Sequence, residues 1–211
     1  MKRILITGMP RSGTSFTHEI FYGACNKISL YRKMMFTEHK FFCLSEPLCF
    51  STKGIRQDVE VATKMVEMIE RYQSEYLLEE DGNRLFVMKC HPLIHSPTEL
   101  FDLFDNVLIC VRKPESWILS AQQHPAASEQ MRLYAKRSGM PAERYGNFLY
   151  NCSIDLVQRL TDRYNGKDVV ELLDFHEPEE NLEKLKKVIR YATEENIERL
   201  FRENWRGSRF E

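Results

Sequence analysis

The sequence has no hydrophobic run that approaches the roughly 20 apolar residues needed to cross a bilayer. Its first residues, Met1-Lys2-Arg3, lead directly into an apolar run that is too short for the hydrophobic part of a secretory signal. Internal repeats and low-complexity tracts are lacking as well. We therefore expect a folded cytoplasmic protein with no membrane partner.

A surplus of either charge is also lacking. The sequence has 30 Lys and Arg residues against 31 Asp and Glu residues, which leaves a formal net charge of -1. A chain with a net charge this close to zero has no bulk attraction to nucleic acid or to an acidic membrane surface. We expect no nucleic-acid partner, and any anion-binding site has to be local.

Zinc-site and redox motifs are missing. The six cysteines form no C-x-x-C pair and no cluster with histidine at the spacing of a zinc site. The cysteines are therefore predicted to be reduced, mostly buried thiols, and no bound metal is expected.

Short apolar runs alternate with helical periodicity along the 211 residues, a length that fits one domain, residues 1–211. The runs predict buried strands at 4–6, 85–88, 107–111 and 168–173. The periodicity predicts helices at 59–78, 141–164, 179–191 and 193–204, the last with Thr193 as its N-cap. Strands that alternate with helices predict an α/β fold, a mostly parallel central sheet flanked by helices.

A glycine loop follows the first predicted strand directly. Residues 8–15 have the sequence Gly-Met-Pro-Arg-Ser-Gly-Thr-Ser and lead into a predicted helix. Such a loop lets successive amides converge on an anion, which the helix dipole also attracts. The spacing is close to that of a Walker A loop, but Thr14 stands where an NTPase carries its lysine, and Arg11 lies inside the loop. We therefore predict a phosphate ligand other than a hydrolysed triphosphate.

Two further predicted strands are each followed by a cation, Lys89 and Arg112, where a kinase would need a carboxylate for magnesium. Ligands of open parallel sheets bind at the carboxyl ends of the strands, so Arg11, Lys89, His91 and Arg112 are expected to converge. At such an edge His91 can serve as a base, because imidazole titrates near neutral pH, and Lys89 can stabilise negative charge. The alternative is that His91-Pro92 only turns the chain after a strand.

Three segments, residues 10–16, 89–92 and 112–120, resemble in order and spacing the sulfotransferases that use 3′-phosphoadenosine 5′-phosphosulfate (PAPS). The resemblance implies a P-loop-like α/β fold of the sulfotransferase type and PAPS as the sulfuryl donor, with no metal. It implies that Arg11 and the amides of the loop hold the 5′-phosphosulfate, that Phe16 lies near the adenine, and that Arg112 and Ser120 hold the 3′-phosphate. The donor-binding residues implied in the first segment are Pro10, Arg11, Ser12, Gly13, Thr14, Ser15 and Phe16.

Other parts of the chain match that family less fully. Glu46, followed by Pro47, resembles a glutamate near the acceptor in carbohydrate-type and bacterial members, and is the second candidate base after His91; a solvated turn carboxylate is the alternative. Arg206-Gly207 stands where cytosolic members close an R-K-G element over the nucleotide. Residues 27–56 show no regular period and predict a long functional loop, which leaves open whether they form a lid. The compact chain implies a small-molecule or carbohydrate acceptor.

Two other functions stay open at this point. A P-loop nucleotide kinase or NTP-binding protein with a degenerate Walker A loop would explain the glycine loop, but the missing lysine and carboxylate disfavour it. A catalytically inactive nucleotide-binding protein would also fit. The presence of Lys89, His91, Arg112 and Ser120 disfavours that hypothesis.

Overall fold

The computed structural model describes residues 2–24, 41–45, 85–90, 97–122, 139–190 and 192–205 and, in part, 60–71 and 135–136. Within these residues, five parallel strands form one sheet in the order β2-β3-β1-β4-β5. The strands are β1 (Lys2–Gly8), β2 (Phe41–Ser45), β3 (Leu85–Lys89), β4 (Asn106–Val111) and β5 (Val170–Asp174).

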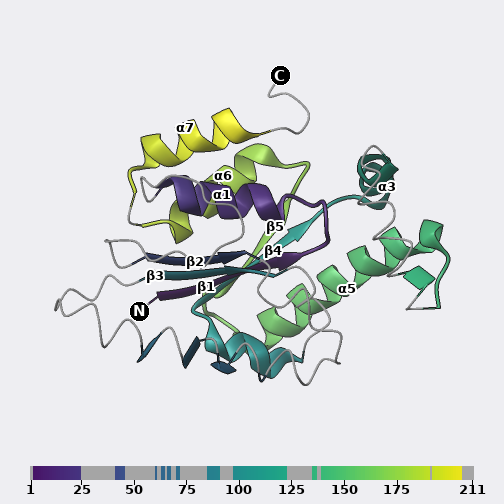
Figure 1. Ribbon diagram of the computed structural model, residues 1–211, viewed down its shortest axis with the longest axis horizontal. Coiled ribbons are helices and arrows are strands. Elements are labelled where there is room, and N and C mark those ends of the chain that lie inside the picture. Colours follow the sequence, from purple (N-terminus) through teal and green to yellow (C-terminus); the bar gives the residue numbers. More distant parts are fainter. Residues whose placement is uncertain are drawn as a thin grey trace.

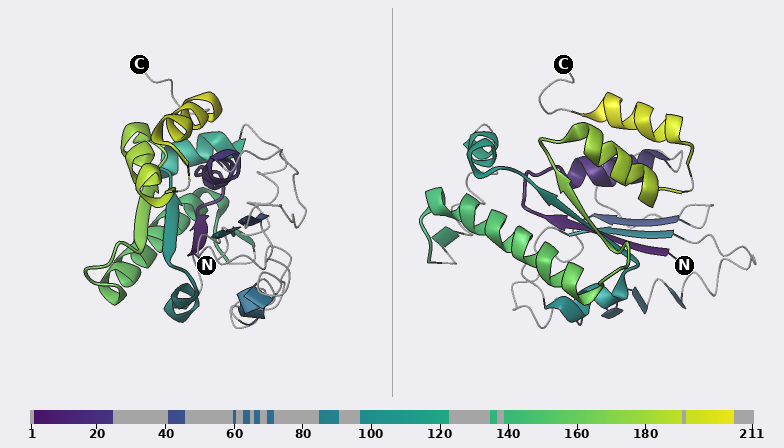
Figure 2. Two further views of the ribbon diagram at one scale, coloured as in Figure 1. Left: turned by 90° about the vertical axis from the view of Figure 1, so that its left-hand side faces the viewer. Right: turned by 180° about the vertical axis from the view of Figure 1, so that it is seen from behind.

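Helices cover both faces of this sheet, as Figures 1 and 2 show. One face carries α1 (Thr14–Ala24), α6 (Pro178–Val188) and α7 (Glu194–Asn204). The other face carries α5 (Ala142–Arg163), and the short 3-10 helix η2 (Thr98–Leu103) packs into the same apolar cluster. Helix α3 (Pro114–Gln122) follows β4 and packs against α5. None of the helices within the described ranges has both the length and the apolar character that a membrane crossing requires.

The central strands are apolar on both faces because each face has its own core. In β1, Ile4 and Ile6 point into the cluster with α1, α6 and α7, whereas Leu5 points into the cluster with α5. The same alternation continues in β4, where Leu108 faces the first cluster and Ile109 the second. A strand buried on both sides has an unbroken apolar sequence, which is the signal by which the sequence predicted it.

The predicted α/β class and parallel sheet are confirmed, and so are four of the strands, with changes at their ends. Helices α5, α6 and α7 lie within the predicted ranges or one residue beyond them, and Thr193 Oγ1 accepts a hydrogen bond from Asn196 N at 3.3 Å as the predicted N-cap of α7. The described residues between Glu60 and Arg71 are helical, as the periodicity of 59–78 predicted.

The prediction that residues 27–56 lack regular structure is wrong in one place. Phe41–Ser45 forms the edge strand β2, which pairs in parallel with β3. Whether so short a segment becomes an edge strand depends on its partner strand, and β3 lies about 40 residues later in the sequence. Local periodicity therefore gave no signal for β2. The rest of 27–56, including the predicted lid, lies outside the described residues.

Candidate active site

The glycine loop leaves the sheet between β3 and β4, the two neighbours of β1. Gly8, the last residue of β1, has a φ of 130°, and a Cβ placed on it would lie 2.1 Å from the carbonyl oxygen of Cys110. The next amide, that of Met9, donates to the same oxygen at 3.1 Å. Only glycine fits so close to the neighbouring strand, and this contact starts the turn of the loop.

Ser12 holds the loop in shape. Its Oγ lies 2.5 Å from the Met9 carbonyl oxygen and 2.8 Å from that of Cys110, and the side chain is buried. The Ser12 amide donates to Met9 O at 3.2 Å, which differs from the expectation that this amide holds the ligand. Thr17 N donates to Gly13 O at 2.8 Å, so the helix begins there and the amides of its first turn have no intrahelical acceptor. Those amides, and the helix dipole behind them, form an anion-binding end.

Two guanidinium groups meet at this loop. Arg112, just beyond β4, donates from Nη1 to the carbonyl oxygen of Arg11 at 3.2 Å and from Nε to Ser116 Oγ at 3.0 Å. Its guanidinium carbon lies 4.2 Å from the centre of the Phe175 ring. In the part of the chain that the structure describes, no carboxylate forms an ion pair with Arg11 or Arg112. Partial burial, and then the positive charge of Arg11, lower the pKa of Arg112 from its ordinary value.

The third cation reaches the loop from the other neighbouring strand. Lys89, a buried residue, ends β3, and its Nζ donates to Ser15 Oγ at 2.9 Å, in the first turn of α1. The structure thus brings Arg11, Lys89 and Arg112 to one edge of the sheet, as the sequence predicted. Positive charges that face one helix N-terminus repel one another, and an anion between them relieves this repulsion.

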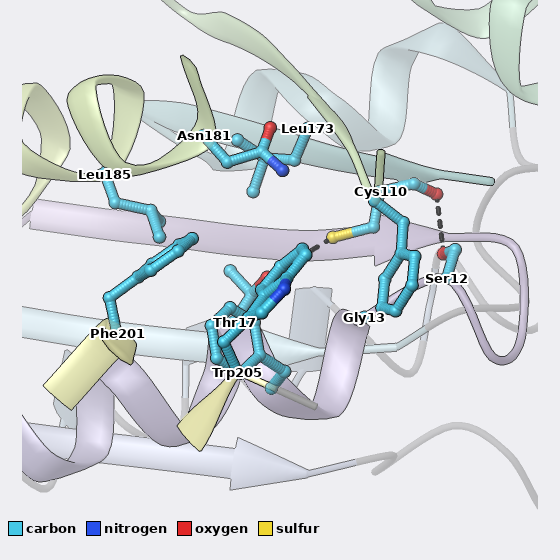
Figure 3. A pocket seen from close by; sticks show the side chains of 11 residues that line it. Ser12, Gly13, Thr17, Cys110, Leu173, Asn181, Leu185, Phe201 and Trp205 are labelled. Atoms are coloured by element: carbon cyan, nitrogen blue, oxygen red, sulfur yellow. Dashed lines mark hydrogen bonds between the residues drawn. The ribbon is translucent and has the colours of Figure 1, made fainter. Parts of the chain in front are cut away.

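An aromatic pocket lies beside the loop, between α1, α6, α7 and the ends of β4 and β5 (Figure 3). Its free volume is only about 10 Å³, roughly the room for one water molecule, because its own side chains nearly fill it. Phe16 meets Trp205 edge-on at 5.2 Å between ring centres, and Trp205 stacks on Phe175 at 5.0 Å. The remaining lining residues are Ser12, Gly13, Thr17, Cys110, Leu173, Asn181, Leu185 and Phe201. The pocket thus places aromatic side chains directly beside the cationic loop.

The Cys110 thiol forms the inner wall of this pocket and contacts Thr17 Oγ1 at 3.5 Å (Figure 3). Burial raises the pKa of Cys110 to about 12, while the Thr17 contact and the charge of Lys89 act in the opposite direction. Because only the thiolate is strongly nucleophilic, Cys110 is a packing residue here.

Four of the predicted site residues, His91, Glu46, Arg206 and Gly207, lie outside the described residues. Ser120 is buried on α3, one turn beyond Ser116, the residue that Arg112 contacts. Pro10 accepts a hydrogen bond from the indole Nε1 of the buried Trp117 at 2.5 Å, which attaches the loop to α3.

Sequence reasoning missed three residues of this site: Ser116, Phe175 and Trp205. The spacing of four residues between Arg112 and Ser116 was a usable signal, because such a residue lies in the first turn of the following helix. Phe175 and Trp205 reach the site from distant parts of the chain, and no local pattern marks them.

Comparisons with known proteins found no matching family model and no matching curated protein. Among solved structures, the chain is similar to the sulfotransferase domain from the curacin biosynthetic pathway, with a TM-score of 0.49 and 12% identity, over 98% of this chain and 78% of that one. It is also similar to retinol dehydratase in complex with androsterone and the inactive cofactor PAP, with a TM-score of 0.45 and 12% identity. That match covers 97% of this chain and 65% of the other. At 12% identity these similarities assign no site residues, so the site is described from the geometry of this chain alone.

Proposed function

We propose that this chain is a sulfotransferase that transfers the sulfuryl group of PAPS to a hydroxyl or amine of a small-molecule or carbohydrate acceptor. The observation that carries the proposal is the pair Arg11 and Arg112, which lie together at a helix N-terminus without a carboxylate partner among the described residues. Two uncompensated guanidinium groups suit a ligand with more than one anionic group, because each presents planar donors to phosphate oxygens.

PAPS has three parts that this site would hold: the 5′-phosphosulfate, the 3′-phosphate and the adenine. Arg11 and the first amides of α1 would hold the 5′-phosphosulfate, and Arg112 would hold the 3′-phosphate, with Ser120 beside it. Phe16 and Trp205 would lie beside the adenine at the pocket next to the loop. PAPS, when bound, supplies an activated sulfuryl group joined to its 5′-phosphate through a bridging oxygen.

Lys89 would act on the leaving side of the transfer. Its ammonium group lies 2.9 Å from Ser15 Oγ, in the turn where the 5′-phosphosulfate is expected, and carries a positive charge. A fixed positive charge beside the bridging oxygen stabilises the negative charge that develops there.

His91, two residues beyond Lys89, would take the proton from the acceptor hydroxyl as that oxygen attacks sulfur. Glu46 is the second candidate for this role.

The first test is nucleotide binding. We expect adenosine 3′,5′-bisphosphate (PAP), the product of transfer, to raise the melting temperature of the protein, and ATP with Mg²⁺ to have little effect, because a ligand that binds only the native state stabilises it. Arg112→Ala should weaken PAP binding by about 2 kcal/mol, the scale of a lost charged hydrogen-bond pair. Lys113→Ala, which removes an exposed neighbouring cation, serves as the matched control. A shift with ATP and Mg²⁺ alone would instead support the kinase hypothesis.

The second test is turnover with labelled PAPS and a panel of hydroxyl and amine acceptors. We expect His91→Ala to lose transfer while it keeps its affinity for PAP. If transfer survives in His91→Ala and disappears in Glu46→Ala, the base is Glu46. A wild-type protein that binds PAP but labels no acceptor would favour the inactive nucleotide-binding hypothesis.

A further inference from the structure

The guanidinium of Arg112 is fixed by three separate parts of the chain. Ser116, in the first turn of α3, accepts from Nε at 3.0 Å. The Arg11 carbonyl oxygen, in the glycine loop, accepts from Nη1 at 3.2 Å. The ring of Phe175, the residue after β5, lies under the guanidinium at 4.2 Å. A planar cation that is bonded at two of its nitrogens and stacked on a ring has little freedom to turn.

These contacts decide which N–H groups of the Arg112 guanidinium remain available to a ligand. A guanidinium has five N–H donors, and two of them are used by Ser116 and the Arg11 carbonyl. The other three are on Nη1 and Nη2, and none of them has an acceptor among the residues that the structure describes. Because Nε is occupied by Ser116, the Nε–Nη2 edge is closed, and a phosphate would bind through Nη2 and the remaining N–H of Nη1.

Ser116 orients Arg112 without cancelling its charge. A carboxylate at this position, four residues beyond the arginine, would form an ion pair with Nε and compete with any incoming anion. The serine hydroxyl accepts the same hydrogen bond as a neutral group. Partial burial already makes the charge of Arg112 costly, as its lowered pKa indicates, and a bound anion would compensate that charge.

We propose that Ser116 and Phe175 are positioning residues that hold Arg112 with its Nη1–Nη2 edge toward the 3′-phosphate, and so make the site selective for nucleotides that carry a 3′-phosphate. This inference rests on the proposed function and adds to it two residues that act through Arg112. Ser116 is a selectivity residue because its neutral hydroxyl leaves the full charge of Arg112 for the ligand.

The experiment is calorimetric titration of the full chain with PAP and with adenosine 5′-monophosphate, which lacks the 3′-phosphate. We expect Ser116→Ala to weaken PAP binding about fivefold, the equivalent of one net hydrogen bond, and to leave the monophosphate unchanged. Ser116→Thr, which keeps a hydroxyl, should restore PAP affinity. Ser116→Asp should weaken PAP binding by on the order of 30-fold or more, because it pairs with Arg112. Glu115→Ala, at an exposed neighbouring position, is the control.

A double-mutant cycle separates positioning from a structural role. In an Arg112→Ala background, Ser116→Ala should have no further effect on PAP affinity, because the residue through which it acts is gone. Phe175→Leu keeps apolar bulk but removes the ring face, and should weaken PAP binding about threefold with the monophosphate unchanged. Equal losses for both ligands, or losses that persist without Arg112, would overturn the inference.

The outcomes also distinguish this inference from the proposed function. If the wild-type protein prefers PAP and the Ser116 variants keep that preference, the positioning role fails and the proposed function stands. If the wild-type protein does not distinguish PAP from the monophosphate, both fail.

Discussion

Arg11 has an unusual backbone conformation for its residue type. Its φ is 67°, in the left-handed region that costs a non-glycine residue about 1 kcal/mol or more. The conformation is held by its neighbours: Ser12 is bonded to two carbonyl oxygens, and the Arg11 carbonyl itself accepts from Arg112. This conformation matters for the site, because it places the exposed Arg11 guanidinium at the turn and points the Arg11 carbonyl oxygen toward Arg112.

Two substitutions at this position separate charge from strain. Arg11→Gly removes the side chain and relaxes the left-handed residue, so we expect the free energy of unfolding to rise by about 0.5–1 kcal/mol. Arg11→Ala removes the same charge but keeps the strain, and should bring no such gain. Both should lose affinity for PAP to a similar extent, as measured by titration, with unfolding followed in urea. Equal stability of the two variants would show that the left-handed conformation is not strained.

At the scale of elements, helix α5 is attached at its C-terminal end to the 3-10 helix η2. Arg163 forms an ion pair with the Asp102 carboxylate through two nitrogens, and the Tyr164 hydroxyl donates to Asp102 Oδ1 at 2.7 Å. The hydrogen bond from Arg163 lowers the pKa of Asp102. Burial, and then the bond to Asp102, raise the pKa of Tyr164 to about 12. The anchor therefore requires an ionised Asp102 and a protonated Tyr164.

This anchor predicts a contribution to stability that is lost in alkali. Between pH 10 and about 12 the unfolded state releases the Tyr164 proton while the folded state keeps it, so the free energy of unfolding falls as the pH rises. The contribution is complete below pH 10 and absent above about 12. We expect it to be within about 1 kcal/mol, because the ion pair of Arg163 and Asp102 that the hydroxyl joins is exposed to solvent.

Urea unfolding of wild-type protein and Tyr164→Phe from pH 8 to 12 measures this difference. The wild-type curve should fall more steeply in the upper part of the range, since phenylalanine has no proton to lose. Parallel curves would exclude the anchor as a source of alkaline sensitivity.

At the scale of the whole molecule, helix α7 packs over α1 and α6 on one side of the sheet (Figure 1), and its Phe201 lines the pocket. It packs closely on α1: a Cβ on Gly23 would lie 2.9 Å from a methyl carbon of Leu200. Phe201 is fully buried, and its ring meets Phe16 edge-on at 5.0 Å and stacks on Trp205 at 5.3 Å. The last described segment of the chain is thus part of the core under the loop.

Phe201→Ala tests this arrangement. We expect a loss of about 3–5 kcal/mol in the free energy of unfolding, from the apolar surface and the cavity that the ring leaves, and a weaker response to PAP. Glu203→Ala, two residues later on the same helix and exposed, should change stability by less than about 0.5 kcal/mol. If both variants unfolded at the same urea concentration, α7 would not be part of the cooperative unit.

Much of the site was predictable because its signals are local. The short-range patterns are the glycine spacing, Arg11 inside the loop and the cations that follow two apolar runs. Because parallel strands end at the same edge of a sheet, these patterns also predicted that Arg11, Lys89 and Arg112 lie close together. His91 and Glu46 remain predictions. Ser116 was within reach of the same reasoning, because its spacing from Arg112 places it in the first turn of the next helix.

The sequence by itself determined the α/β class, the glycine loop, the cationic strand ends and the N-cap of α7, since these depend on residues a few positions apart. Only the tertiary structure decided that β2 forms an edge of the sheet, that Phe175 lies under Arg112, and that Trp205 borders the pocket. The β2–β3 pairing and the contact between Phe175 and Arg112 join segments more than 40 positions apart, and Trp205 meets Phe16 from the other end of the chain. Such pairings depend on how the whole core packs, and a short sequence pattern carries no information about that packing.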